Sequence, residues 1–416
     1  MKKLLVIGYV WPEPNSSAAG SRMLQLLDCF QQDGYVITYA SPAQGSDHAV
    51  DLHALNIEPI NIEINSSTFD EFITQLQPDA VLFDRFMMEE QFAWRVEKYC
   101  PHALRILDTE DLHSLRFARQ KMAKANTDLV IKEVDNLHLY TDQAKREIAA
   151  ILRCDLSIMI SEYEMAFLQE RFGVPNNILT YIPFMLDSPV SSDLKGFDER
   201  HHFVSIGNFR HEPNWDAVLC LKQFIWPAIR KKLPKAQLHI YGAYPPKKAS
   251  QLHNEKQGFL VKGWVADAQQ MLNEARVLLA PLRFGAGLKG KFLDAAQCGL
   301  PSVTTSIGSE GLFANDKDSQ TLLTHDDFKV FSDAAAALYD DEELWLSLQG
   351  NCLEFIRQRF DRKQHMKALL EQVNDIGSKL EEHRLNNFMG SMLRHHSLKS
   401  TQYMAQWIEA KNKLVD

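Results

Sequence analysis

Residues 275–301 read ARVLLAPLRFGAGLKGKFLDAAQCGLP, and this stretch decides the fold class. The apolar run ARVLLAPL predicts a buried strand, and LDAAQCGLP predicts a short helix. Between them, residues 283–292 contain three glycines and three cations. We therefore expect a strand, a glycine-rich turn and a helix in direct succession, which is the repeating unit of α/β proteins.

The same alternation of apolar runs and amphipathic stretches extends along the chain in both directions. Because the runs are continuously apolar rather than alternating with polar residues, they predict parallel sheets that are covered on both faces. The predicted strands are Leu4–Val10, Tyr35–Ala40, Ala80–Asp84, Leu104–Asp108, Leu156–Ile160, Phe203–Gly207, Gln237–Tyr241, Val277–Ala280 and Ser302–Thr305. The fold class is therefore α/β, with doubly wound sheets.

The length of 416 residues favours two domains, and a short internal repeat indicates where the second domain begins. The segments IGYVWPEPN (residues 7–15) and IGNFRHEPN (residues 206–214) share five residues at equal spacing, and each follows an apolar run. The polar segment 187–202 reads as a linker. We predict a domain at 1–190, a second at 200–375, and a helical tail at 376–416.

The composition restricts the class of protein. With 45% apolar and 24% charged residues the chain is typical of a soluble globular protein, and its net charge of −9 argues against nucleic-acid binding. Six scattered cysteines form no C-x-x-C pair, which favours reduced thiols and a cytoplasmic location. The apolar start is short and reads as a strand rather than a signal peptide. No apolar run approaches the roughly 18 residues that span a bilayer.

The glycine-rich junction has four interpretations. It fits the P-loop pattern G-x-x-x-x-G-K, but Phe292 stands where a magnesium-binding Ser or Thr belongs. It also fits the dinucleotide pattern G-x-G-x-x-G, with Glu310 twenty residues beyond Gly290, although the two lysines are unusual in such a turn. A plain connecting turn is the third interpretation, and it leaves three neighbouring cations to repel one another.

The fourth interpretation, which we favour, is a binding site for a diphosphate. Glycines let the backbone approach an anion closely, and a helix that begins near Lys289 directs its positive end to the same place. Arg283 and a lysine supply full charges, and Asp294, one turn into the helix, accepts hydrogen bonds from a ribose. A nucleotide diphosphate would then place a sugar in the cleft between the domains.

These residues resemble a known family. The segment PLRFGAGLKGKFLDAAQCGLPSVTTSIGSEGL is similar to the donor site of glycosyltransferase family 4, which has the GT-B fold. GNFRHEPNWDAV, WPAIRKKLPKAQLHIYG, VKGWVADAQQMLNEARVLLAPL, PEPNSSAAGSRMLQLLDCF and LDTEDLHSLR also look like family segments. The resemblance covers most of residues 1–375, is strong around 200–312, and does not extend to the tail.

The resemblance implies that a sugar is transferred with retention from a nucleotide-diphosphate donor, without a bound metal or other cofactor. The donor would bind the C-terminal domain and the acceptor, a glycan or lipid-linked molecule of the cell surface, the N-terminal domain. Arg283, Lys289 and His113 are the implied catalytic residues, with His113 facing the transferred sugar. The implied donor-binding residues are Gly20, Gly207, Asn208, Gly285, Ala286, Gly287, Leu288, Lys291, Asp294 and Glu310.

The sequence departs from the family pattern at three places. Ala286 stands where many members have an acid, Asp294 replaces a glutamate, and Asp216 stands where many have a lysine. These changes leave two alternatives to the transferase open: a catalytically degenerate binding protein or partner subunit, and a sugar-nucleotide epimerase.

Three further segments carry weaker signals. Residues 316–318 read DKD, which resembles a metal-binding D-x-D but reads better as a polar loop. The helical stretch 115–126 has four cations and no acid, and a solvated face is favoured there over contact with anionic lipid or acceptor phosphates. The amphipathic tail is expected to pack back on the body, with peripheral contact at the inner face of a membrane as the alternative.

Overall fold

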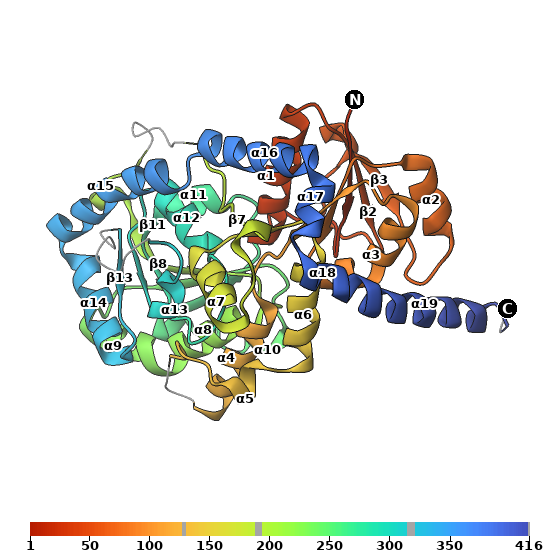
Figure 1. The fold of residues 1–416 in the computed structure, drawn as a ribbon. Coiled ribbons are helices and arrows are strands. Elements are labelled where there is room, and N and C mark those ends of the chain that lie inside the picture. Colours follow the sequence, from red (N-terminus) through yellow and green to blue (C-terminus); the bar gives the residue numbers. More distant parts are fainter. Residues whose placement is uncertain (127–129, 188–193, 314–320, 415–416) are drawn as a thin grey trace.

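The computed structural model describes residues 1–126, 130–187, 194–313 and 321–414, and two parallel sheets organise it (Figure 1). The first has seven strands in the order β3-β2-β1-β4-β5-β6-β7. These strands are β1 (Lys3–Ile7), β2 (Val36–Ser41), β3 (Glu58–Asn61), β4 (Ala80–Asp84), β5 (Leu104–Asp108), β6 (Leu156–Met159) and β7 (Leu179–Tyr181). Leu5 and Ile7 face one core cluster and Leu4 and Val6 another, so both faces of the sheet are buried.

The second sheet has six parallel strands in the order β10-β9-β8-β11-β12-β13. They are β8 (His201–Ile206), β9 (Leu238–Tyr241), β10 (Phe259–Gly263), β11 (Ala275–Ala280), β12 (Ser302–Thr304) and β13 (Leu322–Thr324). The order reverses at β8 and β11, as it does at β1 and β4 in the first sheet. All nine predicted strands are present with small shifts at their ends, which confirms the doubly wound α/β class.

Helices connect the strands and cover both sheets. Around the first sheet lie α1 (Ala18–Gln32), α2 (Thr68–Leu76), α3 (Phe86–Tyr99), α4 (His113–Ala125), α5 (Asn136–Leu139), α6 (Asp142–Arg153) and α7 (Glu162–Phe172). Around the second lie α8 (Glu212–Cys220), α9 (Trp226–Lys232), α10 (Lys247–Ser250), α11 (Ala268–Glu274), α12 (Gly290–Gln297), α13 (Ser306–Ser309), α14 (Phe328–Asp340) and α15 (Glu342–Arg359). Short 3₁₀ turns occur at His53–Leu55, Asn176–Ile178, Phe197–Glu199 and Glu255–Gln257, and a π-helical turn, Leu221–Ile225, joins α8 to α9.

After α15 the chain returns to the first domain. The amide of Leu186 donates to the carbonyl of Phe360 (2.8 Å), and Arg362 donates back to Leu186 (3.0 Å), so the outward and return crossings lie side by side. Helix α16 (Arg362–Ser378) then buries Met366 and Leu369 in the core of the first sheet. The sequence prediction placed residues up to 375 in the C-terminal domain. The return occurs earlier because the apolar face of α16 packs on α1.

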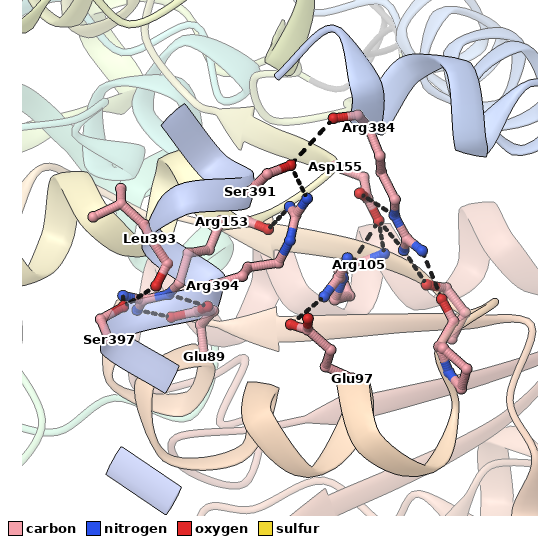
Figure 2. Close-up of polar contacts among 12 residues, drawn as sticks. Glu89, Glu97, Arg105, Arg153, Asp155, Arg384, Ser391, Leu393, Arg394 and Ser397 are labelled. Carbon is pink, nitrogen blue, oxygen red and sulfur yellow. Dashed lines mark hydrogen bonds and ion pairs between the residues drawn. The ribbon is translucent and has the colours of Figure 1, made fainter. Parts of the chain in front are cut away.

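The tail continues along the first domain as α17 (Leu380–Leu385), α18 (Phe388–Leu393), a π-helical turn (Arg394–Leu398) and α19 (Lys399–Asn412). Figure 2 shows how polar contacts hold it. Arg384 binds the buried carboxylate of Asp155 through two nitrogens, at 2.7 and 2.8 Å. Arg394 donates to the carbonyl of Arg153 at 3.1 Å, and Arg153 in turn binds Glu89 and Ser397.

Several sequence predictions concern residues that the structure describes only in part. Residues 188–193 of the predicted linker and the DKD stretch at 316–318 lie outside the described residues. All six cysteines are described, and each is free and buried. Among the described helices, none combines the length and the apolar character needed to cross a bilayer.

Candidate functional site

A cleft of about 1150 Å³ lies between the two domains. It is lined by residues at or just after the carboxyl ends of strands in both sheets, among them Asp84 at the end of β4, Arg85 after it, Gly207 after β8 and the turn after β11. The carboxyl ends of parallel strands, next to the point where strand order reverses, are where doubly wound domains bind ligands. The glycine-rich junction of residues 283–292 forms part of one wall.

Helix α12 directs its N-terminus at this cleft. Lys289 is the N-cap residue, and no side chain caps the first turn. The amides of a first turn lack intrahelical partners, and the helix dipole gives that end a partial positive charge. The uncapped N-terminus of an eight-residue helix, next to glycines that expose backbone, is therefore suited to an anion.

Two ammonium groups add full charge to this wall. Lys291 Nζ donates to Asn214 Oδ1 at 2.7 Å, and among the described residues no carboxylate forms an ion pair with it. Its burial lowers the pKa of Lys291 to about 8. Burial also lowers the pKa of Lys289, but Glu310 and Glu164 nearby oppose that shift. Lys291 therefore has less negative charge close to it than Lys289 has, and an anion bound in the cleft would neutralise its ammonium group.

Three glycines on the walls have no room for a side chain. A Cβ at Gly20 would lie 2.5 Å from the backbone of Glu13, and one at Gly287 would lie 2.8 Å from Asp111 Cβ. Gly287 also has φ of +62°, a conformation that glycine adopts without strain. A Cβ at Gly207 would meet the Asn214 side chain at 2.5 Å. Close packing of backbone thus shapes both walls.

Further polar groups surround the two lysines. Asp294 is exposed to the cleft one turn into α12, and the desolvation of this site raises its pKa to about 6. Asn208 lines the cleft after β8, and its Oδ1 accepts a hydrogen bond from the amide of Arg210 at 2.8 Å. The guanidinium of Arg210 stacks 3.6 Å from the ring centre of Tyr244. The C-terminal wall therefore combines cations, amide groups and two acids, Asp267 and Asp294.

The N-terminal wall is strained and acidic. Arg85 and Glu110 follow β4 and β5, and both have left-handed backbone, with φ of +68° and +59°. Such conformations are costly for residues other than glycine and tend to occur at functional sites. Asp84 accepts a hydrogen bond from Tyr9 N at 3.0 Å. Burial, and the neighbouring Asp108, raise the pKa of Glu110 well above its usual value.

His113 lines the cleft at the start of α4, and buried acids hold that helix end in place. Glu147 accepts hydrogen bonds from the amides of His113 and Ser114, each at 2.8 Å. Glu164 accepts from Leu112 N at 3.0 Å. Burial lowers the pKa of His113 to about 4, so its imidazole is neutral at pH 7. A neutral imidazole in this position can exchange hydrogen bonds with a hydroxyl.

At one end of the cleft, side chains from the two domains meet. Tyr244 Oη donates to Glu13 Oε2 at 2.8 Å, and Trp264 Nε1 donates to the carbonyl of Asn15 at 3.2 Å. The imidazole of His48 stacks on the Trp264 indole with 4.9 Å between ring centres. This end of the cleft is therefore closed by contacts between the domains.

Comparison with solved structures identifies the fold to which this cleft belongs. Sucrose-phosphate synthase from Thermosynechococcus elongatus superposes with a TM-score of 0.68 at 14% identity, covering 91% of this chain and 100% of that one. TarM from S. aureus gives 0.69 at 10% identity, with 90% and 100% covered, and HepE from Anabaena gives 0.65 at 13%, also with 90% and 100% covered. The chain has the GT-B fold. At these identities the likeness concerns the fold alone.

The sequence comparison adds a family for part of this GT-B chain. Residues 200–341, within the C-terminal domain, match the family described as glycosyl transferases group 1. No curated protein matches the sequence significantly.

Within the GT-B cleft the structure brings together most of the residues predicted from the sequence. The cleft is lined by His113, Gly20, Gly207, Asn208, Gly285, Ala286, Gly287, Leu288, Lys289, Lys291 and Asp294. Two predicted residues, Arg283 and Glu310, do not line it. Both instead make contacts between the two domains.

The position of Arg283 differs from the expectation that this residue faces a diphosphate. Its Nε donates to Asp216 Oδ2 at 2.9 Å, and Nη1 donates to the carbonyls of Ala123 (3.2 Å) and Asn126 (2.8 Å) at the end of α4. A cation at the C-terminus of a helix also interacts favourably with the helix dipole. The guanidinium is therefore already bound, and it joins α8 to the N-terminal domain.

Glu310 is the second correction. Both carboxylate oxygens of Glu310 bind the fully buried guanidinium of Arg119, at 2.8 and 2.7 Å. The carboxylate is therefore already paired and is not positioned to bind a ribose. Arg119 also donates to the carbonyl of Gly285 at 2.9 Å, and Gly287 N donates to Glu164 Oε1 at 2.8 Å. The carbonyl of Arg283 also accepts from Ile131 N at 2.8 Å, so three backbone groups of the glycine-rich junction bind the N-terminal domain.

Sequence reasoning missed several residues on the GT-B cleft. Arg210 stands only within the quoted segment GNFRHEPNWDAV, and Arg85 and Glu110 are not among the predicted residues. Arg85 and Glu110 each come directly or soon after an apolar strand that ends in aspartate. That position, at the carboxyl end of a parallel strand, was the available signal.

Proposed function

We propose that the chain is a retaining, family 4 type glycosyltransferase that moves a sugar from a nucleotide-diphosphate donor to a glycan or lipid-linked acceptor. Its place would be in cell-surface polysaccharide synthesis, on the cytoplasmic side of a membrane, and no bound metal is required. One observation carries the proposal: Lys291, without an acidic partner among the described residues, lies on the cleft beside the uncapped N-terminus of α12.

The chemistry follows from where charge develops. When the bond between the sugar and the nucleotide breaks, negative charge accumulates on the departing diphosphate. Donors that are already in place for that charge supply much of the stabilisation of a transition state. Lys291, the first amides of α12 and Lys289 are such donors, and Lys289 contributes less net charge because carboxylates surround it.

The proton of the attacking hydroxyl needs a destination. In this proposal the departing phosphate accepts it on the face from which it leaves, which retains the configuration of the sugar. His113 is neutral at pH 7 and orients a hydroxyl of the transferred sugar instead of acting as the base. Asp84 and Glu110, on the N-terminal wall, have one buried oxygen each without a partner and bind hydroxyls of the acceptor.

A donor screen tests the proposal. The full chain is incubated with a panel of sugar nucleotides, and released nucleotide is measured with and without glycan acceptors. UDP-glucose is the first probe, because the HepE structure of this fold was solved with it. Release that depends on an acceptor supports the transferase. Turnover of donor alone would indicate an epimerase, and calorimetric binding without turnover would indicate a degenerate binding protein.

We expect Asp294 to recognise the ribose. Replacing Asp294 with alanine should weaken the binding of UDP about tenfold or more, since hydrogen bonds to a charged group are lost. The same variant should bind the 2′,3′-dideoxy nucleotide as the wild type does. Isothermal titration calorimetry of both proteins with both nucleotides measures the difference. An equal loss for both nucleotides would place the ribose elsewhere.

Nucleotide affinity should depend on pH through Lys291. The free protein loses the Lys291 proton as the pH rises through about 8, whereas a bound diphosphate stabilises the ammonium form and raises its pKa. The affinity for UDP should therefore fall about tenfold between pH 7 and pH 9. In Lys291→Arg the charge persists over this range, so the fall should disappear. An identical fall in that variant would assign the titration to another group.

A further inference from the structure

The outer side of the tail carries large apolar side chains in solvent. From α17 to α19, exposed positions recur every three or four residues and form one continuous face. Phe388 is 75% exposed and Trp407 is 60% exposed, although side chains of this size are usually buried. The exposed apolar residues of this outer face are Leu385, Phe388, Met389, Met392, Tyr403, Met404, Trp407 and Leu414.

The inner side of the tail is fixed, so these side chains cannot turn inward. Leu398 and Ala405 are buried in the core of the first sheet. Arg384 and Arg394 are held at the surface of the first domain by the contacts in Figure 2. Near the end of α19, Glu409 accepts a hydrogen bond from the amide of Ser67 at 3.2 Å. The tail is therefore attached along its length, and its outer face points away from the protein.

The charges on the outer face have one sign. Between residues 385 and 414 its basic side chains without a carboxylate partner are Lys399, Lys411, His395 and His396. The only acid in that range, Glu409, accepts a hydrogen bond from Ser67 and also pairs with Lys413 at 2.9 Å, which neutralises that lysine. Two other acids, Glu381 and Glu382, precede the face at the start of α17. A protein with a net charge of −9 thus presents a face on which cations accompany aromatic and sulphur-containing residues.

We propose that the outer face of residues 385–414 binds the surface of a bilayer that contains anionic lipids. An interfacial helix inserts Trp, Tyr, Phe and Leu side chains at the level of the headgroups, while Lys side chains extend toward lipid phosphates. The stretch 115–126 is less suited, because Arg116 binds Asp111 and Arg119 is buried against Glu310. A second copy of the chain would bring like charges together at a twofold interface.

Vesicle co-sedimentation of the full chain tests this surface. We expect the wild type to sediment with vesicles of phosphatidylcholine mixed with phosphatidylglycerol and to remain largely soluble with phosphatidylcholine alone. Phe388→Ser combined with Trp407→Ser should reduce the bound fraction at least about tenfold, since two inserted side chains are lost. Lys399→Glu combined with Lys411→Glu should do the same.

The controls use exposed residues outside the tail. Leu137, which is 85% exposed on α5, is replaced by serine, and Lys256, in the turn Glu255–Gln257, by glutamate. Both should sediment as the wild type does. All variants change exposed positions, and thermal unfolding verifies that they fold. The fluorescence of Trp407 should shift to the blue on binding anionic vesicles, and the shift should be absent in Trp407→Ser.

Three outcomes would overturn the proposal: no binding of the wild type to anionic vesicles, equal binding by the tail variants, or equal binding to neutral vesicles. A concentration-dependent dimer that Phe388→Ser and Trp407→Ser abolish would instead assign the face to a second copy. The result is independent of the proposed reaction, because turnover of a soluble donor and acceptor should be unchanged in the tail variants. Loss of turnover with vesicle binding intact would contradict only the proposed reaction.

Discussion

Replacing Lys291 with alanine is expected to reduce kcat for sugar transfer about 100-fold, which corresponds to about 3 kcal/mol of transition-state stabilisation. The ammonium group lies on the cleft beside α12, and among the described residues its hydrogen-bond partner is the neutral Asn214. An interaction that strengthens as charge develops on the leaving group lowers kcat when it is removed. Steady-state kinetics with the donor identified in the screen measures the change.

Two control variants test whether the loss of activity comes from the charge of Lys291. Lys291→Arg retains the charge and should lose much less activity than Lys291→Ala, although its planar group has a different reach. Lys231→Ala, at an exposed position on α9, should behave as the wild type. If Lys291→Ala retained wild-type kcat, the leaving diphosphate would not be stabilised at this helix N-terminus.

Replacing Arg283 with alanine is expected to lower the free energy of unfolding by about 3–5 kcal/mol, because Asp216 is left without its buried partner. The carbonyls at the end of α4 also lose their donor. Chemical denaturation of the full chain, followed by tryptophan fluorescence, measures the change. A small change in stability with a large loss of kcat would favour the sequence-based expectation of a phosphate contact.

A double-mutant cycle separates these two roles of Arg283. If the ion pair with Asp216 dominates, adding Arg283→Ala to Asp216→Ala should cost much less stability than it does in the wild type. If Arg283 acts on the diphosphate, the effects of the two substitutions on kcat should multiply. The cycle therefore requires stability and kinetics to be measured on the same four proteins.

The strands found from the sequence are the interior strands of the two sheets. The four missed strands are β3, β7, β10 and β13, and each is the edge strand of its sheet. An edge strand is shorter and partly exposed, so it lacks the continuous apolar run that identifies a central strand. Strand β3, for example, reads EPIN and contains a proline, which an edge position tolerates.

The candidate site was predictable where it depended on local sequence and unpredictable where it depended on distant contacts. Lys289, Lys291 and Asp294 lie on the cleft because they share one turn and one short helix. Arg283 stands in the same stretch, but the destination of its side chain is set by Asp216, far away in the sequence. The replacement of an expected lysine by Asp216 was the signal that a nearby cation would be paired.

The return of the chain at Phe360 has a consequence for biosynthesis. The first domain needs α16 to cover Met23 and the tail to bind Asp155, yet these segments are made after the second domain. Residues 1–187 made alone should therefore aggregate or recruit chaperones. During translation the second domain can complete its core before α16 and the tail of the first domain have been made. A premature stop after α15 would therefore leave the second domain able to fold and the first domain without the helices that cover it.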